Sequence, residues 1–382
     1  MKKEIGYRLF AFVYKICCIF PVKKEKIFCV MTHDSSEEGN VGVVKKYLED
    51  RNTDWKFCCL KREDTRFSGQ EKLKKIVRFF VKYPYELATS AYVFQDNIFL
   101  PIAFLKFRKK VKVVQLWHGT GTIKKFGQDV NIGRLKELER LANNSITHLV
   151  INSERWNSYA RIFSVTNDKL QVLGMPRTDL FFSEDKKEQI EELFFMENPN
   201  LIGKKIILYA PTFRDDRLGE QTLQLDIELW LEKMPEDTIL GLRLHPFVAE
   251  NFQYVGKGSE RIVDFSHYAN LNTLLFISSG LITDYSSIVF EYVLLDKPMY
   301  FYAYDLEEFS DNGRGFYEEY EEYVPGVVVR STKELVDKML EYEHNLERRE
   351  YWKEKRKKFK EENYCYFDGN STKRLVKLLD ME

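Results

Sequence analysis

The sequence predicts an α/β protein made of two doubly wound domains. Short β-branched and aromatic runs alternate with longer, charged amphipathic stretches, which is the pattern of a parallel sheet covered by helices. This alternation starts a second time after residue 203. The length of 382 residues suits two domains of ordinary size, and a hydrophobic content of 44% is ample for two packed interiors.

The first domain is expected over residues 1–180. Its predicted strands are the six β-branched or aromatic runs at 26–31, 55–60, 91–97, 111–117, 148–152 and 170–173. Charged stretches between several of them predict helices. The segment 184–203 is charged and then loop-like, so we interpret it as a linker.

The second domain is expected over residues 200–365, and residues 366–382 are expected to form a charged helical tail. Its predicted strands are the runs KKIILYAP, TILGLRLH, GLITDYSS and PMYFYAYD, at 204–211, 238–245, 280–287 and 298–305. Ligands of open α/β sheets bind beyond the carboxyl ends of the strands. Two such domains that face each other would therefore enclose the ligand in a cleft.

The charge is balanced overall but uneven along the chain. Residues 1–130 hold 26 Lys and Arg against 14 Asp and Glu, a net charge of +12, so the remainder carries −12. A basic first third suggests an anionic surface or substrate. The sequence contains no zinc-finger spacing, RNP-type aromatic motif or basic zipper, so no nucleic acid is expected. A membrane surface fits better, because the basic residues alternate with large apolar ones.

Two segments of this basic region could lie on an anionic membrane. Residues 1–22 are apolar after a basic start, but Lys15 interrupts them, no small-residue cleavage site follows, and they fall short of the ~20 residues that span a bilayer. We expect an interfacial helix there; a helix packed on its own domain is the alternative. The same two interpretations apply to 70–83, and 104–112 adds a second basic cluster.

The six cysteines include no CxxC pair. Neither a disulfide framework nor a zinc site is expected, and buried thiols in a reducing compartment are the simpler interpretation.

Polar groups follow several predicted strands. They stand in His118-Gly-Thr, Met175-Pro-Arg177-Thr, Ala210-Pro-Thr-Phe-Arg214, Arg243-Leu-His245-Pro and Asp284-Tyr-Ser-Ser. One such histidine is usually structural, but two histidines, several arginines and a serine pair at strand ends indicate a functional site.

This set has the chemistry of a diphosphate site. Arg177 and Arg243 offer forked donors for phosphate oxygens, although a salt bridge is the alternative for both. Ser286 and Ser287 open a predicted helix, whose unpaired N–H groups favour an anion, although a plain N-cap is the alternative.

His118 suits a general base, since imidazole titrates near neutral pH. Gly119 and Gly121 would let a substrate approach the turn that follows it. His245 would bind phosphate or protonate the leaving group. The remaining histidines are interpreted as structural or surface residues; among them, His33 follows the first strand.

Long motifs resemble the CDP-glycerol glycerophosphotransferases of teichoic acid synthesis, the TagB/TagF type. They are HGTGTIKKFG, APTFRDD, LRLHP, ITDYSSIVFEYVLLDKPMYFYAYDLEEF and RGFYEEYEEYVPG, and the resemblance runs from about residue 26 to 330. It implies a GT-B-like fold of two Rossmann-like domains with a cleft between them. It also implies transfer of glycerol phosphate from CDP-glycerol to a hydroxyl of an undecaprenyl-diphosphate-linked saccharide, with release of CMP.

The resemblance assigns roles to residues of this chain. His118 and His245 would be catalytic, with His118 deprotonating the acceptor hydroxyl. The substrate-binding set falls on Gly119, Thr120, Gly121, Thr122, Arg177, Pro211, Thr212, Arg243, Leu244, Ser286, Ser287 and Glu291. The family usually has Asp where this chain has Glu291, beside the polyol, and commonly has Pro at the position of Gly121.

No cofactor is expected. Asp215 and Asp216 could bind Mg²⁺, but a solvated loop is the simpler interpretation.

The compact chain resembles the primase-like form, and the resemblance implies a peripheral protein at the cytoplasmic face of the membrane. Three readings stay open: a CDP-glycerol enzyme, a CDP-ribitol or nucleotide-sugar transferase, and a non-catalytic scaffold. The oligomeric state stays open as well.

Overall fold

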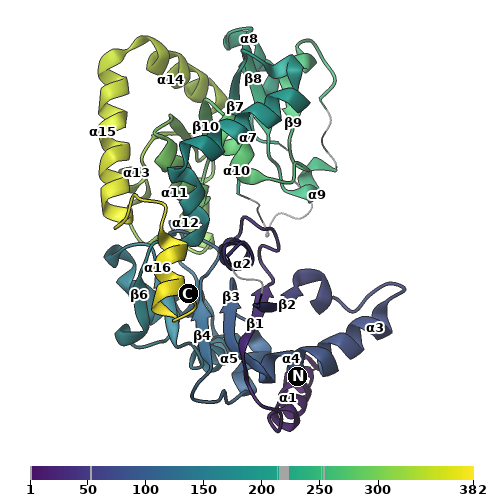
Figure 1. Cartoon of the computed structure of the whole chain (residues 1–382). Coiled ribbons are helices and arrows are strands. Elements are labelled where there is room, and N and C mark those ends of the chain that lie inside the picture. Colours follow the sequence, from purple (N-terminus) through teal and green to yellow (C-terminus); the bar gives the residue numbers. More distant parts are fainter. Residues whose placement is uncertain (1, 52–53, 213, 215–222, 251, 253) are drawn as a thin grey trace. The chain divides into compact units, whose positions relative to one another are not determined.

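The structure, a computed structural model, describes residues 2–51, 54–212, 214, 223–250, 252 and 254–382 (Figure 1). The chain forms two compact units. Unit 1 comprises residues 1–120, 126–182 and 363–382, and unit 2 comprises residues 121–125 and 183–362. Each unit contains one six-stranded, fully parallel sheet with helices on it, as the alternating sequence pattern predicts.

The sheet of unit 1 has the strand order β2-β1-β3-β4-β5-β6. Its strands are β1 (Lys23–Met31), β2 (Lys56–Lys61), β3 (Ser90–Gln95), β4 (Lys112–Gln115), β5 (His148–Ile151) and β6 (Leu170–Val172). The helices of this unit are α1 (Lys2–Cys17), α2 (Asn40–Glu49), α3 (Lys72–Val77), α4 (Tyr83–Ala88), α5 (Gly133–Asn143), α6 (Tyr159–Ile162) and α16 (Ser371–Leu378). A π-helical turn, Arg78–Lys82, joins α3 to α4.

Alternate residues of β1 enter two different cores, because successive side chains of a strand point to opposite faces. Ile27 and Cys29 pack with residues of α2 and α16. Phe28 and Val30 pack on the other face with Phe10 of α1 and with residues of the turn and α4. Both faces of the strand are therefore apolar, as expected for a parallel sheet covered on both sides.

The sheet of unit 2 has the strand order β9-β8-β7-β10-β11-β12, which is the 3-2-1-4-5-6 order of a Rossmann fold. Its strands are β7 (Lys205–Tyr209), β8 (Thr238–Leu242), β9 (Ile262–Asp264), β10 (Gly280–Thr283), β11 (Met299–Tyr302) and β12 (Val327–Val329). The helices are α7 (Glu184–Glu197), α8 (Ile227–Lys233), α9 (Pro246–Ala249), α10 (Leu271–Ile277), α11 (Ile288–Tyr292), α12 (Leu306–Asn312), α13 (Tyr320–Tyr323), α14 (Thr332–His344) and α15 (Leu346–Asn363).

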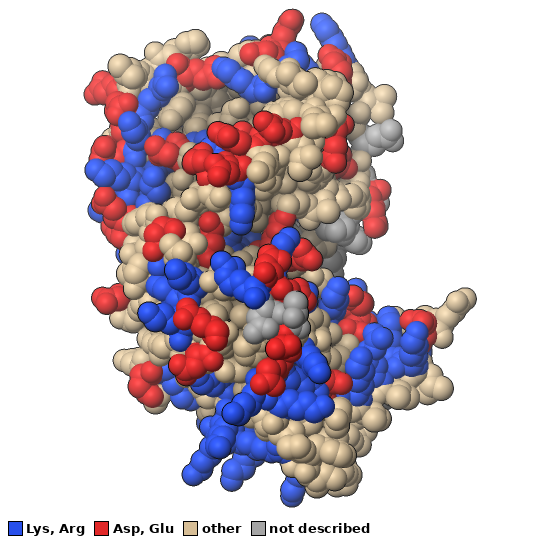
Figure 2. Space-filling model, in the orientation of Figure 1, with Lys and Arg blue, Asp and Glu red and all other residues tan. Residues whose placement is uncertain are grey.

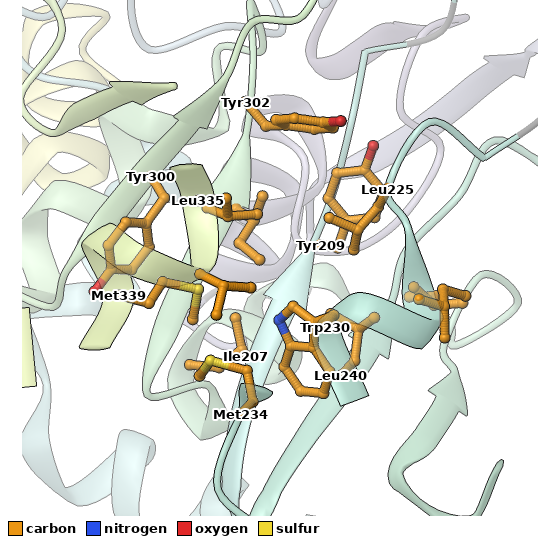
Figure 3. Packing of buried hydrophobic residues seen from close by; sticks show 14 of the residues in the cluster. Ile207, Tyr209, Leu225, Trp230, Met234, Leu240, Tyr300, Tyr302, Leu335 and Met339 are labelled. Carbon is orange, nitrogen blue, oxygen red and sulfur yellow. The ribbon is translucent and has the colours of Figure 1, made fainter. Parts of the chain in front are cut away.

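Trp230 of α8 lies at the centre of one apolar core of unit 2 (Figure 3). It is fully buried among Leu240 of β8, Ile207 of β7 and Met234. The strand runs predicted for this domain supply this core, so hydrophobic burial of those runs determines where the sheet forms.

The expected fold class is confirmed, and all ten predicted strands are present with ends that differ by a few residues. Two expectations are corrected. The segment 184–203, interpreted as a linker, contains the helix α7. Residues 366–382, expected as a separate tail, belong to unit 1. There the carboxylate of Asp179 accepts the N–H groups of Ser371 and Thr372, both at 2.8 Å, which fixes the start of α16.

Within the described part of the chain, no helix combines the length and the apolar character needed to cross a membrane.

Candidate functional site

In unit 1, polar residues gather where the strand order changes direction. The first strand, β1, has β2 on one side and β3 on the other, which makes the β1/β3 junction the topological switch point of this sheet. Open α/β sheets bind ligands at such a point. His33 follows β1, Asp96 follows β3, and His118 follows β4.

Asp96 ties these three strand ends together. Its carboxylate accepts the backbone N–H groups of Thr32 at 3.0 Å, His33 at 3.2 Å and Asp34 at 2.8 Å. Its backbone carbonyl oxygen lies 3.0 Å from Nδ1 of His118. Burial raises the pKa of Asp96 to about 6, although the three N–H groups act in the opposite direction.

This contact determines the tautomer of His118. A carbonyl oxygen can only accept, so Nδ1 carries the hydrogen and Nε2 keeps its lone pair. Burial lowers the pKa of His118 well below its usual value, and the neighbouring His33 lowers it further. The two imidazoles stack with centroids 3.5 Å apart and planes 6° apart. At neutral pH His118 is therefore a neutral ring whose Nε2 can take up a proton.

Several contacts hold the backbone at His118. Nη1 of Arg177 donates to the carbonyl oxygen of His118 at 2.7 Å. Nδ2 of Asn40 donates to the carbonyl oxygen of Trp117 at 3.0 Å, and Oδ1 of Asn40 accepts the N–H of Arg177, also at 3.0 Å. Asn40 is buried at the start of α2. Arg177, predicted from sequence as a phosphate ligand, here positions the histidine.

The residue before His118 adopts an uncommon backbone conformation. Trp117 has a φ of +55°, which is rare for a bulky residue and costs about 1–3 kcal/mol. Its ring packs parallel to Phe126 with centroids 5.0 Å apart and lies edge-on to Phe163, also at 5.0 Å. These aromatic contacts offset the strain and direct the chain so that His118 faces Asp96.

The glycine-bearing turn that follows His118 is largely buried at Gly119, Thr120 and Gly121. The hydroxyl of Thr122 donates to the carbonyl oxygen of Lys124 at 2.6 Å. Within unit 2, the N–H of Lys125 donates to Gly315 at 3.0 Å, which anchors the end of the turn.

In unit 2, the strand order changes direction between β7 and β10, and the residues that follow these strands lie together. The carboxylate oxygen Oδ1 of Asp284 accepts the N–H of Thr212 at 2.8 Å and the N–H of Tyr285 at 2.6 Å. The hydroxyl of Tyr320 donates to the carbonyl oxygen of Asp284 at 3.0 Å. These bonds fix the loop of Pro211 and Thr212 against the start of the β10–α11 connection.

Arg214 balances two buried carboxylates there. Its guanidinium forms a two-point contact with Asp305, at 2.8 and 2.9 Å, and lies 3.0 Å from Asp284. The hydroxyl of Tyr285 also donates to Asp305, at 2.9 Å. Burial opposes the charge of Arg214, but the hydrogen bond from Asp305 and the charges of both carboxylates outweigh it and raise its pKa.

The other candidate residues of unit 2 have varied settings. Arg243 is half-buried and donates to the carbonyl oxygens of Phe265 and Ser266. Burial lowers its pKa. The N–H of the buried Leu244 donates to the hydroxyl of Ser266 at 3.0 Å. His245 is exposed and precedes α9.

Ser286 and Ser287 belong to the β10–α11 connection, and Glu291 lies in α11 itself. Both serines are half-buried, and Oγ of Ser286 accepts the N–H of Ile288 at a long 3.4 Å. Glu291 is only 4% exposed, so its side chain lies inside unit 2.

Sequence reasoning missed Asn40, Asp96, Asp284 and Asp305 as members of these networks. Two signals could have found them: Asp96 ends a predicted strand, and Asp284 stands in the quoted Asp-Tyr-Ser-Ser motif. Asp215 and Asp216 lie outside the described residues. The described residues contain no group of three or more His, Cys, Asp or Glu that could hold a metal ion.

Comparison with known proteins identifies the class of protein that this fold and these residues define. A family model described as CDP-Glycerol:Poly(glycerophosphate) glycerophosphotransferase matches residues 12–380. The chain therefore belongs to this family, as its motifs predict.

Individual relatives agree with the family. The chain is 34% identical over 307 residues to the teichoic acid ribitol-phosphate polymerase TarL of Staphylococcus aureus, covering 78% of this chain and 53% of that protein. It is 33% identical over 306 residues to the teichoic acid glycerol-phosphate primase of Bacillus subtilis, covering 78% and 76%. It thus spans about half the length of two of the ribitol-phosphate polymerases that it matches.

A solved structure shares the fold. The wall teichoic acid polymerase TagF aligns with a TM-score of 0.79 over 99% of this chain and 95% of that chain, at 19% identity. This likeness shows a GT-B-like fold of two Rossmann-like units.

We expect nuclear magnetic resonance of ¹⁵N-histidine-labelled protein to show His118 as the Nδ1–H tautomer and neutral at pH 6.5. The His33→Ala variant should raise the pKa of His118, because it exposes the ring to water and removes the neighbouring imidazole. An Nε2–H tautomer, or a pKa that does not rise in the variant, would contradict this account of the site.

We expect Asp305→Asn to lower the free energy of unfolding by about 3 kcal/mol, because it leaves the buried guanidinium of Arg214 without its two-point partner. Urea unfolding measures this loss. The matched control is Glu307→Gln, two residues along the chain, whose carboxylate pairs with Arg330 at the surface and whose loss should cause no measurable change. Equal free energies of unfolding for the two variants would rule out the proposed contribution of the Arg214 network to stability.

Proposed function

We propose that this protein transfers a polyol phosphate from a CDP-linked donor to a hydroxyl group of an undecaprenyl-diphosphate-linked saccharide, and that CMP is released. Glycerol is the proposed polyol. The observation that carries this proposal is His118, whose Nδ1 is occupied by the carbonyl oxygen of Asp96 and whose Nε2 keeps its lone pair at neutral pH. Membership of the glycerophosphotransferase family supports the donor class.

In the proposed step, Nε2 of His118 removes the proton from the acceptor hydroxyl. The oxygen attacks the β-phosphorus of the donor, which bears the polyol, and the bond from this phosphorus to the oxygen bridging to CMP breaks. CMP leaves with that oxygen. Charge on the diphosphate would be stabilised by Arg243, His245 and the N–H groups at Ser286 and Ser287.

The polyol is the finer part of the proposal. Relatives of similar identity are named ribitol-phosphate polymerases and glycerol-phosphate primases, so a CDP-ribitol donor is the alternative. Glu291 is the residue on which the choice between glycerol and ribitol could depend, because its buried side chain is longer than the Asp that the family usually has. A non-catalytic scaffold is disfavoured by the specific tautomer and low pKa built around His118.

We also propose that unit 1 works on the membrane surface, peripherally and at its cytoplasmic face. One side of α1 packs into the core through Phe10 and Tyr14. The other side exposes a row of large apolar side chains at helical spacing, Ile5, Leu9, Phe12 and Ile16, and Ile19 follows in the turn after the helix; these side chains are 48–77% exposed. In Figure 2, basic side chains border the apolar surface over α1 and lie among acidic and other side chains over α3.

We expect His118→Ala to reduce CMP release from CDP-glycerol, with a lipid-linked disaccharide as acceptor, by about 10²–10⁴-fold. His344→Ala, an exposed histidine at the end of α14, serves as the control and should keep wild-type turnover. Because the pKa of His118 is lowered, its neutral form persists as the pH falls, and the acid limb of the wild-type profile should lie below pH 6.5. Release of CMP from CDP-ribitol alone would show that the donor is CDP-ribitol and not CDP-glycerol. Full turnover of His118→Ala would refute the proposal that His118 is the general base.

We expect Phe12→Asp/Ile16→Asp to weaken binding to vesicles of phosphatidylglycerol and phosphatidylcholine more than tenfold. Each large apolar side chain contributes about 1.5–3 kcal/mol when it leaves water. The matched control is Leu193→Asp/Met196→Asp, which changes two equally exposed apolar residues of α7 in unit 2 and should bind as the wild type does. Equal losses in both variants, measured by vesicle sedimentation, would exclude α1 as the membrane-facing helix.

A further inference from the structure

A basic hollow lies beside the edge strand of unit 1. The strand β2 has a neighbour on one side only, and the hollow of about 640 Å³ lies between it and the segment of α3, the π-helical turn and α4. Its volume is within the ~300–1,000 Å³ of typical ligand sites. Phe57, Cys58 and Cys59 of β2 line one side. We refer to it as the β2–α3 hollow.

Most acidic groups in this hollow already have a cation. The carboxylate of Asp64 lies 3.2 Å from Arg78, and that of Glu71 lies 2.9 Å from Lys74. The carboxylate of Glu86 lies 2.5 Å from Lys26, which belongs to β1. These pairs neutralise one another and leave no net charge for a ligand.

Three lysines remain. Lys61, Lys75 and Lys82 line the hollow, and their ammonium groups have no ion pair or hydrogen bond among the described residues. Glu63 is the one lining carboxylate that is likewise unpaired in that part of the chain. The lining residues themselves carry one positive charge in excess, and because Lys26 of β1 neutralises Glu86 from outside the hollow, the excess available to a ligand is two. A ligand with two negative charges close together matches this excess.

The helical segment that supplies Lys75 and Lys82 to the hollow also exposes apolar side chains, which lie outside the lining itself. Leu73, Val77 and Val81 are 74%, 53% and 56% exposed and follow one another at a spacing of four residues along α3 and the turn. The turn packs against α1, where Phe79 and Phe10 have ring centroids 5.3 Å apart. The hollow thus borders the surface for which membrane contact is proposed, and its ligand should have an apolar part beside its anionic part.

We propose that the β2–α3 hollow binds the diphosphate headgroup of a membrane lipid, with Lys61, Lys75 and Lys82 on the phosphate oxygens and Leu73, Val77 and Val81 beside the lipid chain. A phosphodiester lipid has one negative charge and would leave half of the excess unmatched. This inference rests on the proposed function in one respect: if the acceptor is a lipid diphosphate, the hollow holds its anchoring end.

The test compares two triple variants of the full chain. Lys61→Gln/Lys75→Gln/Lys82→Gln removes the lysines of the hollow. Lys106→Gln/Lys109→Gln/Lys110→Gln removes three exposed lysines of the same unit that lie outside the hollow, so both variants lose the same charge. Binding is measured by sedimentation with phosphatidylcholine vesicles that contain undecaprenyl diphosphate, and with vesicles that contain phosphatidylglycerol at equal total charge.

The wild type should prefer the diphosphate vesicles. The hollow variant should lose at least about tenfold in affinity for them, since each lysine near an anionic surface contributes roughly 1 kcal/mol. The control variant should lose no more on diphosphate vesicles than on phosphatidylglycerol vesicles. Soluble pyrophosphate should compete only weakly, because it has no lipid chain.

Equal losses in the two variants, or equal wild-type binding to both kinds of vesicle, would overturn the proposal. Full competition by soluble pyrophosphate would overturn the assignment to a lipid. The binding assay needs no catalysis, so the two proposals can fail separately. If the hollow variant selectively loses affinity for diphosphate vesicles while the wild type releases no CMP from either donor, the hollow is supported and the proposed function is refuted.

Discussion

The arrangement of unit 1 depends on one side chain, the carboxylate of Asp96. It accepts three consecutive backbone N–H groups of the turn after β1, while the carbonyl oxygen of the same residue holds the imidazole of His118 after β4. Burying a carboxylate is costly, and the three N–H groups replace the water that it loses. Because β1, β3 and β4 are fixed by the sheet, Asp96 fixes His118 relative to the strand ends rather than to a mobile loop.

In unit 2, the buried carboxylates that follow the strands are stabilised by a cation. Asp284 stands after β10, beside β7, and accepts the N–H groups of Thr212 and Tyr285. Its charge and that of Asp305 are balanced by the buried guanidinium of Arg214. Arg214, which the sequence analysis noted only as a polar residue after a predicted strand, thus stabilises the architecture of the unit. Unit 1 has no comparable guanidinium on Asp96 among its described contacts, so the imidazole of His118 is held by a neutral carbonyl group.

Much of this architecture could be predicted because it depends on local patterns. Most of the ten predicted strands are runs of buried apolar residues, and their burial determines both the strand and its place in the sheet. The strands β9 and β12, at the two edges of the unit 2 sheet, were not predicted. The helix α7 was missed because it buries a single aromatic, Phe194, in an otherwise charged segment.

The candidate site was only partly predictable for a different reason. His118, Arg177 and the serine pair stand in recognisable motifs, but the residues that position them act across the chain. Asn40 reaches Trp117, 77 residues away, and Asp96 reaches back to Asp34, 62 residues away. α16 likewise packs with residues of α2 that lie more than 300 positions earlier. No local pattern encodes such pairs, since each becomes adjacent only after the sheet has formed.

The strain around His118 favours a catalytic role over a structural one. A histidine that only filled space would need neither the positive φ of Trp117, which has a cost, nor a stacked second imidazole. Together they give an unprotonated Nε2 and an imidazolium that burial and His33 make unfavourable. Such a group accepts a proton only while a reacting hydroxyl supplies it, and then passes it on readily. That is the behaviour required of a general base that must be ready for the next turnover.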